Sequence, residues 1–489
     1  MFFNMIQKGA LHATPYTVLL SSDSKLRFVR QYFFVLTCCI KTGGHYHLFL
    51  SLVKIKQKSH RLLAKIKIMK LKTLIFFLLF LLTTTYSFAM YLFIPMDMEQ
   101  KNHLKAYGIA YFAITKEIDV SWLLNYRGGS FMCVFNSTVE DECVIRGVTY
   151  QVIADVQAAA ILNEIAATES NMDEIKLTKV PKIAVYSPKN KLPWDDAVTL
   201  VLTYAEIPYV ILYDEEVING DLPKYDWLHL HHEDFTGQYG KFWFSYRNAP
   251  WYIEDVRSQE ATAAKMGFPK VSQLKLAVSK KIRDFVMGGG YLFAMCSGPD
   301  SFDVALSADG VDICETPFDG DPMDPNAQQK LNYDNCFAFT DFKIVTNPSI
   351  YEISDIDVDP VIHIKNKKND YFTLFEFSAK WDPVPTMLTQ CHQNVISGFM
   401  GQTTAFNKNR IKPHIVILGE TKIFDEARYI HGTYGNGTFT FYGGHDPEDY
   451  QHFVGDPPTD LNLFPNSAGY RLILNNVLFP AAKKQKQKT

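Results

Sequence analysis

The segment from residue 271 to residue 298 constrains the fold of this chain more than any other. A stretch typical of a helix (271–286) runs into three glycines (288–290), and five apolar residues typical of a buried strand (291–295) follow. Cys296, Ser297 and Gly298 come directly after that strand. We therefore expect Cys296 on a sharp strand-to-helix turn, where backbone N–H groups point at developing charge and the thiol can act as a nucleophile. A buried structural cysteine is the alternative.

Strands and helices alternate in the sequence that follows Pro181. The pattern predicts strands at 182–186, 209–213, 225–230 and 291–295, and helices at 195–205 and 271–286. Such alternation predicts an α/β fold with a mostly parallel, doubly wound sheet and a site at the carboxyl ends of the strands. Residues 313–412 break the alternation, so we expect a β-rich insertion over the sheet. Strands at 413–419 and 437–442 and a helix at 469–478 should complete this domain, which spans 179–482.

A smaller α/β domain is predicted to precede it at residues 90–178. Apolar runs there predict strands at 91–95, 107–114 and 144–153. The composition changes near residues 178–181, which we take as the boundary between the two domains.

Residues 69–89 have the organisation of a secretory signal peptide. A basic start is followed by an apolar run (73–86) and by small residues at the −3 and −1 positions of a cleavage site after Ala89. The mature protein should therefore be exported to the periplasm and keep no integral membrane span; an uncleaved anchor is the alternative. Residues 1–68 are predicted to be a gene-model extension, with a genuine basic N-terminal region as the alternative.

Excluding residues 1–89 makes the remaining chain strongly acidic. Thirteen of the 49 basic residues and one of the 52 acidic residues lie in 1–89, so residues 90–489 carry a formal net charge of −15. This charge argues against nucleic acid as a partner. The lysine-rich residues 483–489 are expected to be a solvated tail.

Six cysteines remain in the mature chain. In an oxidising compartment Cys133 could pair with Cys143, and Cys314 with Cys336. Free thiols are the alternative, because spacing alone does not determine disulfide pairing.

A second motif follows the strand predicted at 437–442. His445 stands after Gly443 and Gly444, and Asp446 and Glu448 follow it. A histidine at a strand end can take a proton from a thiol, and a nearby carboxylate would orient it. The alternative is a turn in which Asp446 and Glu448 cap the following segment. Because Cys296 and His445 should lie on the same edge of the sheet, we expect them to act together.

With these motifs, residues 181–480 resemble the class I glutamine amidotransferase-like superfamily, including its ThuA-like and PfpI-like branches. That superfamily carries a G-x-C-x-G elbow and an H-x-E motif after a late strand; here Ala294 replaces the first glycine, and Glu448 lies one residue farther from His445. The resemblance implies a flavodoxin-like sheet with Cys296 as nucleophile, His445 as base and Glu448 or Asp446 as the orienting acid.

The mature chain also resembles exported Bacteroidota proteins that are labelled "asparagine synthetase B". The residues that carry this likeness lie at 102–108, 122–130 and 439–450. ATP-dependent asparagine synthesis is not expected. Met90 offers no N-terminal catalytic cysteine, and Pro299 removes a backbone donor from the one loop that resembles a pyrophosphate cradle.

A third cluster adds a metal-based alternative. His229 and His231 should share one face of a strand, and His232, Glu233 and Asp234 should lie at or beyond its end. His229, His231 and Asp234 could hold zinc or another divalent ion, with Glu233 as a base; the alternative is that the histidines form hydrogen bonds in the wall of the site.

These observations together predict an exported Cys–His hydrolase or amidase that acts on a small-molecule or cell-envelope substrate. Ser297 and Gly298 would supply oxyanion donors, and Gly444, His232 and Glu233 would line the ligand cleft. No organic cofactor is expected. A metal-dependent hydrolase and a non-catalytic ligand-binding protein of the envelope are the alternatives.

Overall fold

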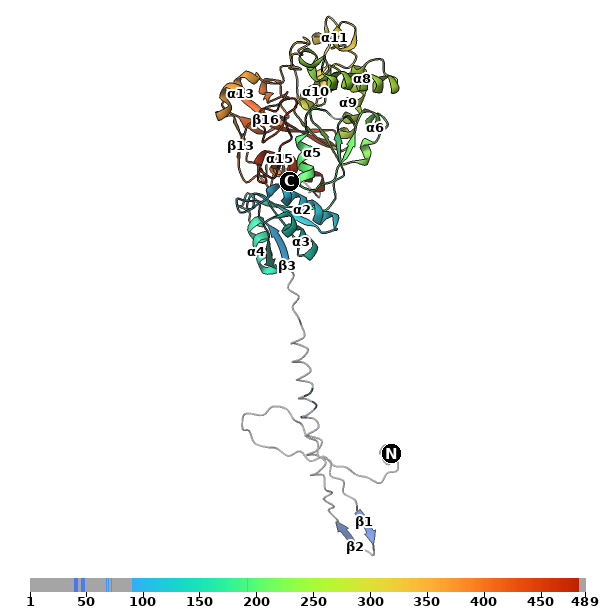
Figure 1. Ribbon diagram of the computed structural model, residues 1–489. Helices are drawn as coiled ribbons and strands as arrows, with labels where there is room; N and C mark the ends of the chain where they lie inside the picture. The colour runs from blue at the N-terminus through green and yellow to red at the C-terminus, as the bar shows by residue number, and fades with distance from the viewer. Residues whose placement is uncertain are drawn as a thin grey trace. The chain divides into compact units, whose positions relative to one another are not determined.

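The computed structural model describes residues 39–42, 45–48, 67, 69, 72, 90–190 and 192–482 (Figure 1). The chain divides into two units, Met1–Ser87 and Phe88–Thr489. In the first unit, β1 (Cys39–Thr42) and β2 (His45–Leu48) form an antiparallel pair. Apart from residues 69 and 72, the predicted signal peptide with its cleavage site lies outside the described residues, as do the basic tail and most of the predicted extension.

A ten-stranded mixed sheet forms the centre of the second unit. Its strands run in the order β13-β12-β15-β16-β17-β11-β10-β8-β9, and β14 pairs with β16. The parallel strands are β8 (Ile183–Tyr186), β9 (Val210–Leu212), β10 (Trp227–Leu230), β11 (Tyr291–Met295) and β17 (Gly437–Tyr442). The other strands, which pair antiparallel, are β12 (Tyr371–Leu374), β13 (Val395–Ser397), β14 (Phe406–Asn407), β15 (Val416–Thr421) and β16 (Glu426–Tyr434).

The expected mostly parallel, doubly wound sheet is therefore wrong. Four of its nine strand pairings are parallel and five are antiparallel. The reason lies in two short connections, residues 422–425 and 435–436, which join β15 to β16 and β16 to β17. A parallel crossover needs a dozen residues or more, so such short loops can only make antiparallel hairpins. Residues 313–412 supply β12, β13 and β14 to this same sheet.

Helices cover both faces of the parallel strands. On one face α5 (Ala197–Tyr204) and α15 (Ala468–Leu478) pack against Val185, Trp227 and Phe293. On the other face α9 (Val271–Met287) and α10 (Gly298–Ser307) pack against Ala184, Leu228 and Leu292. The remaining α-helices after β8 are α6 (Asp214–Ile218), α7 (Trp243–Tyr246), α8 (Pro250–Lys265), α11 (Thr316–Asp319), α12 (Ala327–Lys330), α13 (Pro360–Asn366) and α14 (Pro383–Leu388).

Residues 90–177 form a second, wholly antiparallel sheet with the order β6-β3-β5-β4-β7. Its strands are β3 (Met90–Ile94), β4 (Val120–Leu124), β5 (Ser130–Val134), β6 (Gln151–Ala154) and β7 (Asp173–Leu177), and its helices are α2 (His103–Thr115), α3 (Ser137–Arg146) and α4 (Asp155–Ala166). The core continues from this layer into the larger one, since α2 packs with α5 and α15 in one apolar cluster.

Two of the strands predicted in this layer are wrong. Residues 107–114 belong to the helix α2, which Asn102 caps by accepting the Lys105 N–H at 2.9 Å. This helix is buried on nearly every side, so it lacks the polar face that would have marked its period. Residues 144–146 end the helix α3, which stops at Gly147 in the left-handed region, and only 151–154 form the strand β6.

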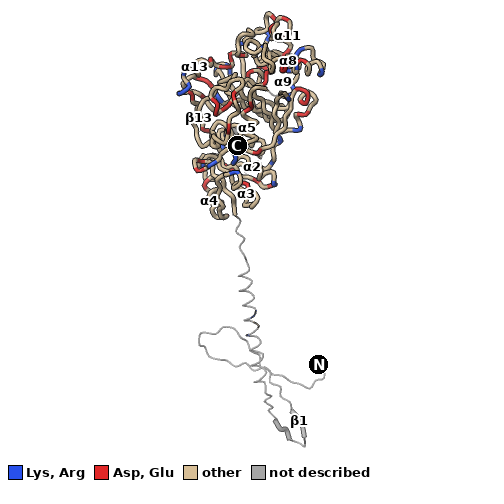
Figure 2. The backbone as a smooth tube through the Cα atoms, in the orientation of Figure 1, with Lys and Arg blue, Asp and Glu red and all other residues tan. Residues whose placement is uncertain are grey.

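The cysteines, the charged residues and the helices show three further features. All six cysteines in residues 90–482 are free thiols, so neither predicted disulfide forms. In the view of Figure 2, basic residues of the described chain are scattered among acidic ones. None of the helices among the described residues has both the length and the apolar character that a membrane span requires.

Candidate functional site

The candidate site lies where four neighbouring parallel strands end. Asp195 and Asp196 lie in the loop between β8 and α5, His231 follows β10, Cys296 follows β11 and His445 lies three residues after β17. Because β8, β10, β11 and β17 are parallel neighbours, their carboxyl ends share one edge of the sheet. Cys296 and the histidines meet because these strands end at the same edge of the sheet, which is where the sequence predicted the site.

Cys296 lies on a tight turn between β11 and α10. Its φ is +52°, which is uncommon for a residue with a side chain. Its N–H donates to the Gly444 carbonyl at 3.0 Å, and the Gly298 N–H donates to the His231 carbonyl at 2.7 Å. A Cβ at residue 298 would lie 2.7 Å from the same His231 carbonyl, so glycine is required there. These bonds tie the Cys296 turn to the loops that carry His231 and His445.

The thiol of Cys296 is buried among backbone donors. Its Sγ accepts the Gln402 N–H at 3.3 Å. Burial raises the pKa of Cys296 to about 11, although the N–H groups of Gln402, Ser297 and Thr403 act in the opposite direction. Among the described residues no hydrogen bond joins this sulfur to a histidine. The cysteine is therefore a neutral thiol near pH 7 in this arrangement.

Three histidines converge beside it. His231, His232 and His445 each offer a ring nitrogen, and these atoms lie within 4.8 Å of one another. The rings of His231 and His445 are 4.4 Å apart between centroids. His231 Nε2, His232 Nδ1 and His445 Nδ1 are buried and have no hydrogen-bond partner among the described residues. Buried ring nitrogens are normally paired, so three unpaired ones at one point indicate a site that a ligand completes.

Asp196 orients this cluster from the neighbouring loop. One carboxylate oxygen caps α5 by accepting the Thr199 N–H at 2.8 Å, and the other lies 3.3 Å from both His229 Nε2 and His231 Nδ1. Burial raises the pKa of Asp196, but the charges and hydrogen bonds of the two histidines outweigh it and hold the pKa well below its ordinary value. A carboxylate on one ring nitrogen directs the other nitrogen of His231 outward, as in the outer shell of a metal centre.

Two imidazoles of the cluster, those of His232 and His445, are neutral near pH 7 because their pKa values are lowered. Burial lowers the pKa of His232 and of His445 well below the ordinary value, and the charges of neighbouring histidines lower it further. Burial also lowers the pKa of His229, with His231 acting in the same direction. Neutral imidazole is the form that binds metal ions and that accepts protons.

His452 and Asp195 belong to the site, although no sequence motif indicated them. The ring of His452 stacks on that of His445, with centroids 4.3 Å apart and 3° between the planes. Its Nε2 lies 3.3 Å from Asp195, and its Nδ1 lies 3.0 Å from Asp449. In the sequence Asp195 stood out only as an acid that opens a helix. His452 could have been found from the sequence because it lies seven residues after His445, in the same loop that follows β17.

Several predicted site residues are engaged elsewhere. Asp446 accepts hydrogen bonds from Glu448 N, Asp449 N and Thr459 Oγ1. Glu448 lines a separate cavity, and Ser467 hydrogen-bonds its carboxyl group. Asp234 accepts from Thr236, Gln238 and Gly240, so it organises its own turn.

The two other predicted residues near the cluster have different roles. Glu233 lies 3.7 Å from His232, and burial raises its pKa well above the ordinary value. Gly444, with φ +99°, brings the backbone close to the Phe399 ring. Asp196 thus occupies the position beside His229 and His231 that the sequence assigned to Asp234.

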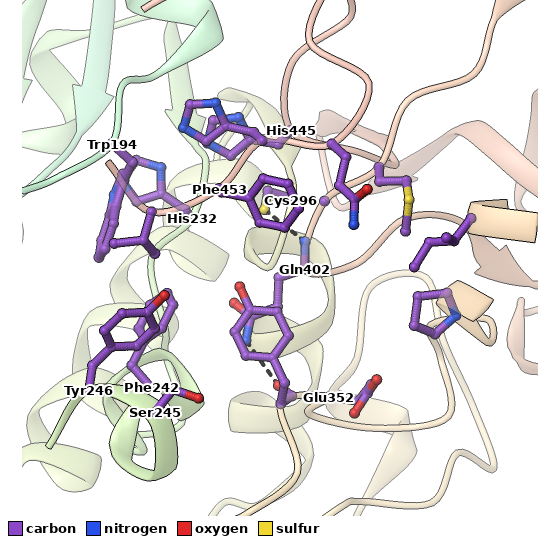
Figure 3. Close-up of a pocket in the computed structure, with 18 residues that line it drawn as sticks. Trp194, His232, Phe242, Ser245, Tyr246, Cys296, Glu352, Gln402, His445 and Phe453 are labelled. Carbon is purple, nitrogen blue, oxygen red and sulfur yellow. Dashed lines mark hydrogen bonds between the residues drawn. The ribbon is translucent and has the colours of Figure 1, made fainter. Parts of the chain in front are cut away.

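A cavity of about 360 Å³ opens onto the histidines and Cys296 (Figure 3). His232, His445 and His452 form one part of its wall, and Gln402 lies beside Cys296. Five aromatic side chains line another part of it: Trp194, Phe242, Tyr246, Tyr351 and Phe453. Its volume suits a small organic ligand.

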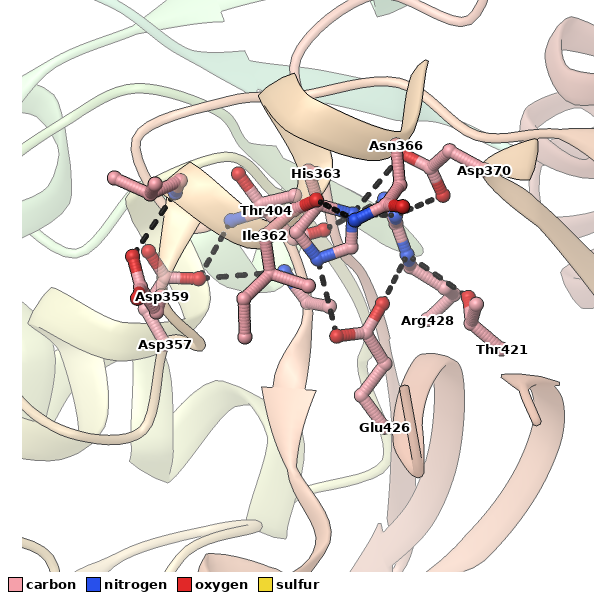
Figure 4. A network of polar contacts seen from close by, with 12 residues as sticks. Asp357, Asp359, Ile362, His363, Asn366, Asp370, Thr404, Thr421, Glu426 and Arg428 are labelled. Atoms are coloured by element: carbon pink, nitrogen blue, oxygen red, sulfur yellow. Dashed lines mark hydrogen bonds and ion pairs between the residues drawn. The ribbon is translucent and has the colours of Figure 1, made fainter. Parts of the chain in front are cut away.

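The loop that supplies Gln402 is held by a buried polar network (Figure 4). Arg428 donates to the carbonyls of Phe399 (2.7 Å) and Thr404 (3.2 Å), and it pairs with Asp370 at 2.6 Å. His363 lies 3.0 Å from both Asp370 and Glu426. Asp357 accepts the N–H groups of Thr404 and Ala405. This network fixes the loop at 399–405 and therefore the donor that faces the Cys296 sulfur.

Comparisons with known proteins add little to this geometry. No family model matches the chain, and no curated protein matches it. It is similar to two solved structures, each over 62% of this chain and 100% of the other. These are cytoplasmic protein STM3548 from Salmonella typhimurium, at 9% identity and a TM-score of 0.32, and cytoplasmic protein STM1381 from Salmonella typhimurium LT2, at 15% and 0.29. Such TM-scores support no inference about function.

Proposed function

We propose that this protein is a metal-dependent hydrolase whose ion binds His231, His232 and His445. The observation that carries this proposal is a cluster of three histidines, each with a buried ring nitrogen that has no hydrogen-bond partner among the described residues. Two of them, His232 and His445, line the cavity. Catalytic zinc sites use three protein ligands and keep a fourth position for water. Zinc–nitrogen bonds of about 2.1 Å place tetrahedral ligands about 3.4 Å apart, so nitrogens within 4.8 Å of one another would need to close by at most about 1.4 Å.

The surrounding residues have roles in this proposal. Asp196 orients His231 and is itself anchored on the N-terminus of α5. His452 stacks on His445 and pairs with Asp195, so these two side chains would hold or move a proton beside the ion-binding histidines. An ion held by the three histidines would supply an activated water and polarise the substrate carbonyl.

Zinc binding by the purified full chain tests the proposal directly. We expect one equivalent of zinc to remain after dialysis, as measured by atomic emission. His231→Ala and His445→Ala should each lower the affinity at least 100-fold, whereas His414→Ala, at an exposed position outside the site, should leave it unchanged. Asp196→Asn, which preserves the cap of α5, should cost about 10- to 100-fold. Equal zinc content in wild type and His445→Ala, with both folded by circular dichroism, would contradict the metal site.

A second candidate function is a Cys296-dependent hydrolase or amidase. The strand-to-helix turn with φ +52° and the three backbone N–H groups around the sulfur favour it. His445, in the wall of the same cavity, would take the thiol proton, and Cys296 would attack the carbonyl. Cys296→Ser would then abolish hydrolysis that a chelator leaves intact. The metal-dependent mechanism predicts the reverse result for both treatments.

The resemblance to the exported Bacteroidota group labelled "asparagine synthetase B" and to glutamine amidotransferase-like proteins also remains a proposal. The glutamine amidotransferase-like resemblance rests on the motifs around Cys296 and His445, and the resemblance to the exported group rests on residues 102–108, 122–130 and 439–450. We infer a periplasmic location from the signal-peptide pattern at 69–89. Fractionation of cells that produce the full chain, with N-terminal sequencing of the mature protein, tests both the location and cleavage after Ala89.

A further inference from the structure

Five aromatic side chains line the site cavity, and four of them lie in contact with one another. Trp194 and Phe242 stack with their centroids 5.1 Å apart and 23° between the planes. Phe242 also contacts Tyr246 (5.8 Å) and Tyr351 (5.6 Å), so rings from three loops form one continuous wall. Figure 3 shows Trp194, Phe242 and Tyr246 on one side of the cavity and His445 beyond them. A flat apolar group of a ligand can stack on such a wall.

The rim of the cavity is apolar and exposed. Phe453 is 57% exposed, Ile364 48% and Tyr351 44%. All three side chains line the cavity, together with the less exposed Met400 and Val454. Large apolar side chains that gather in this way around an opening indicate that an apolar part of a ligand covers them.

The cavity offers no basic side chain to an anion. Among its described lining residues there is no lysine or arginine, and Glu352 contributes a carboxylate. The nearby Lys241 is buried, and its ammonium donates to the carbonyls of Val345 (2.6 Å) and Asn347 (3.2 Å). Asp195 and Asp196 lie behind the histidines and add further negative charge. When no metal ion is bound, a carboxylate or phosphate on the apolar part of a ligand would find no lysine or arginine here and would be repelled by Glu352.

One donor in the wall lacks an acceptor. Trp194 Nε1 is buried and has no hydrogen-bond partner among the described residues. An unpaired indole N–H is costly, and a carbonyl group of a ligand would satisfy it. The same side chain lines the cavity and stacks on Phe242, so a ligand on this wall would lie against Trp194.

We propose that the cavity binds uncharged amides or esters that carry an aromatic or similarly flat apolar group. It selects against the same group when that group bears a carboxylate or phosphate. This assignment of a substrate class rests on the proposed hydrolase function, because an acyl substrate is what the histidine cluster would cleave. The aromatic wall and the exposed rim bind the apolar group, Trp194 donates to the carbonyl, and Glu352 repels anions.

Binding of three matched probes to the full chain tests this class. The probes are N-acetyl-phenylalaninamide, its alanine counterpart without the ring, and its 4-carboxyphenyl counterpart with a charge on the ring. Calorimetry should show the phenylalanine probe binding at least fivefold more tightly than the alanine probe and at least tenfold more tightly than the charged one. Glu352→Gln should strengthen binding of the charged probe and leave the neutral probe unchanged.

A pair of exposed phenylalanines supplies the matched variants. Phe453→Ser, at the rim, should weaken binding of the phenylalanine probe about three- to tenfold. Phe244→Ser changes a side chain of similar exposure (55%) outside the cavity lining and should have no effect. Equal binding of the neutral and charged probes, or an equal loss in both variants, would overturn the proposal.

The design separates this inference from the function on which it rests. Binding is measured once with excess chelator and once with zinc, and no turnover is needed. If zinc does not bind but the ring preference persists, the metal-dependent function fails and the ligand class stands. If zinc binds at the three histidines but the probes show no preference, only the ligand class fails.

Discussion

At the scale of single residues, the ionisation of Cys296 distinguishes the two candidate mechanisms. With a pKa of about 11, less than about one part in a hundred of the thiol is ionised at pH 8, and ionisation rises with pH through that value. We therefore expect alkylation of Cys296 to be slow at pH 6–8 and to accelerate about tenfold for each pH unit up to about pH 10. Peptide mapping by mass spectrometry after timed labelling measures this rate.

The variant His445→Ala is the control for that rate. If His445 activates the thiol in solution, wild type will be labelled rapidly near pH 6 and the variant slowly. Such a difference would contradict the neutral thiol of this structure and support the cysteine mechanism. Equal, slow labelling of both proteins would leave the metal site as the better explanation of the histidines.

The residues of the site divide into those that local sequence could indicate and those that it could not. Cys296, His231, His232 and His445 follow strands, and strand ends converge on one edge of a parallel sheet, so their meeting could be expected. Asp196 caps α5 with one carboxylate oxygen and approaches His231 with the other. Only the cap joins residues that are neighbours in the sequence. Gln402 lies 106 residues from Cys296 in the sequence, and no periodicity of the sequence indicates that the two are in contact.

At the scale of elements, the first turn of α10 contains a carboxyl group that opposes folding at neutral pH. Asp300 is buried; one oxygen accepts from Ser354 Oγ at 2.8 Å and the other has no partner among the described residues. Burial raises its pKa to about 7, and the charges of Asp303, Asp355 and Asp234 add to this effect. Between about pH 4 and pH 7 the folded state keeps a proton that the unfolded state loses, so this residue costs stability as pH rises.

Removing that charge should stabilise the protein. Asp300→Asn is expected to raise the free energy of unfolding by about 1–3 kcal/mol at pH 8 and to have a much smaller effect at pH 4. Urea unfolding at the two pH values measures the change. Asp284→Asn, at an exposed position of α9, is the control and should change stability little. A loss of stability in Asp300→Asn at pH 8 would show that the carboxylate is stabilised in a way that this arrangement does not provide.

Element prediction succeeded where burial was one-sided or where a strand was bounded by turns. The strands β11 and β17 occupy the residues that were expected, and the helix α9 differs by one residue. The helix α2 was predicted as a strand because it is buried on nearly every side, so its sequence has no polar face that would show the helical period. The strand β16 was not predicted at all, and with it the hairpins that make the sheet mixed were missed.

At the scale of the whole molecule, Arg471 joins the two sheets of the second unit. It lies on α15 and is buried, and it donates to the carbonyls of Met96 and Gly128 and to the hydroxyl of Tyr107. Tyr107 in turn donates to Asn475 on α15. Because these contacts and a shared apolar core join the layers, residues 90–482 should unfold in one cooperative transition rather than in two.

Arg471→Met should remove one hydrogen bond each from the Met96 carbonyl, the Gly128 carbonyl and the Tyr107 hydroxyl, and lower the free energy of unfolding by about 3 kcal/mol. Urea unfolding followed by circular dichroism and by tryptophan fluorescence measures both the loss and the number of transitions. Arg257→Met, at an exposed position of α8, should have little effect. Two separate transitions in the wild type would show that residues 90–177 fold independently. In that case Arg471→Met would destabilise only the interface between the layers, because each layer would retain a core of its own.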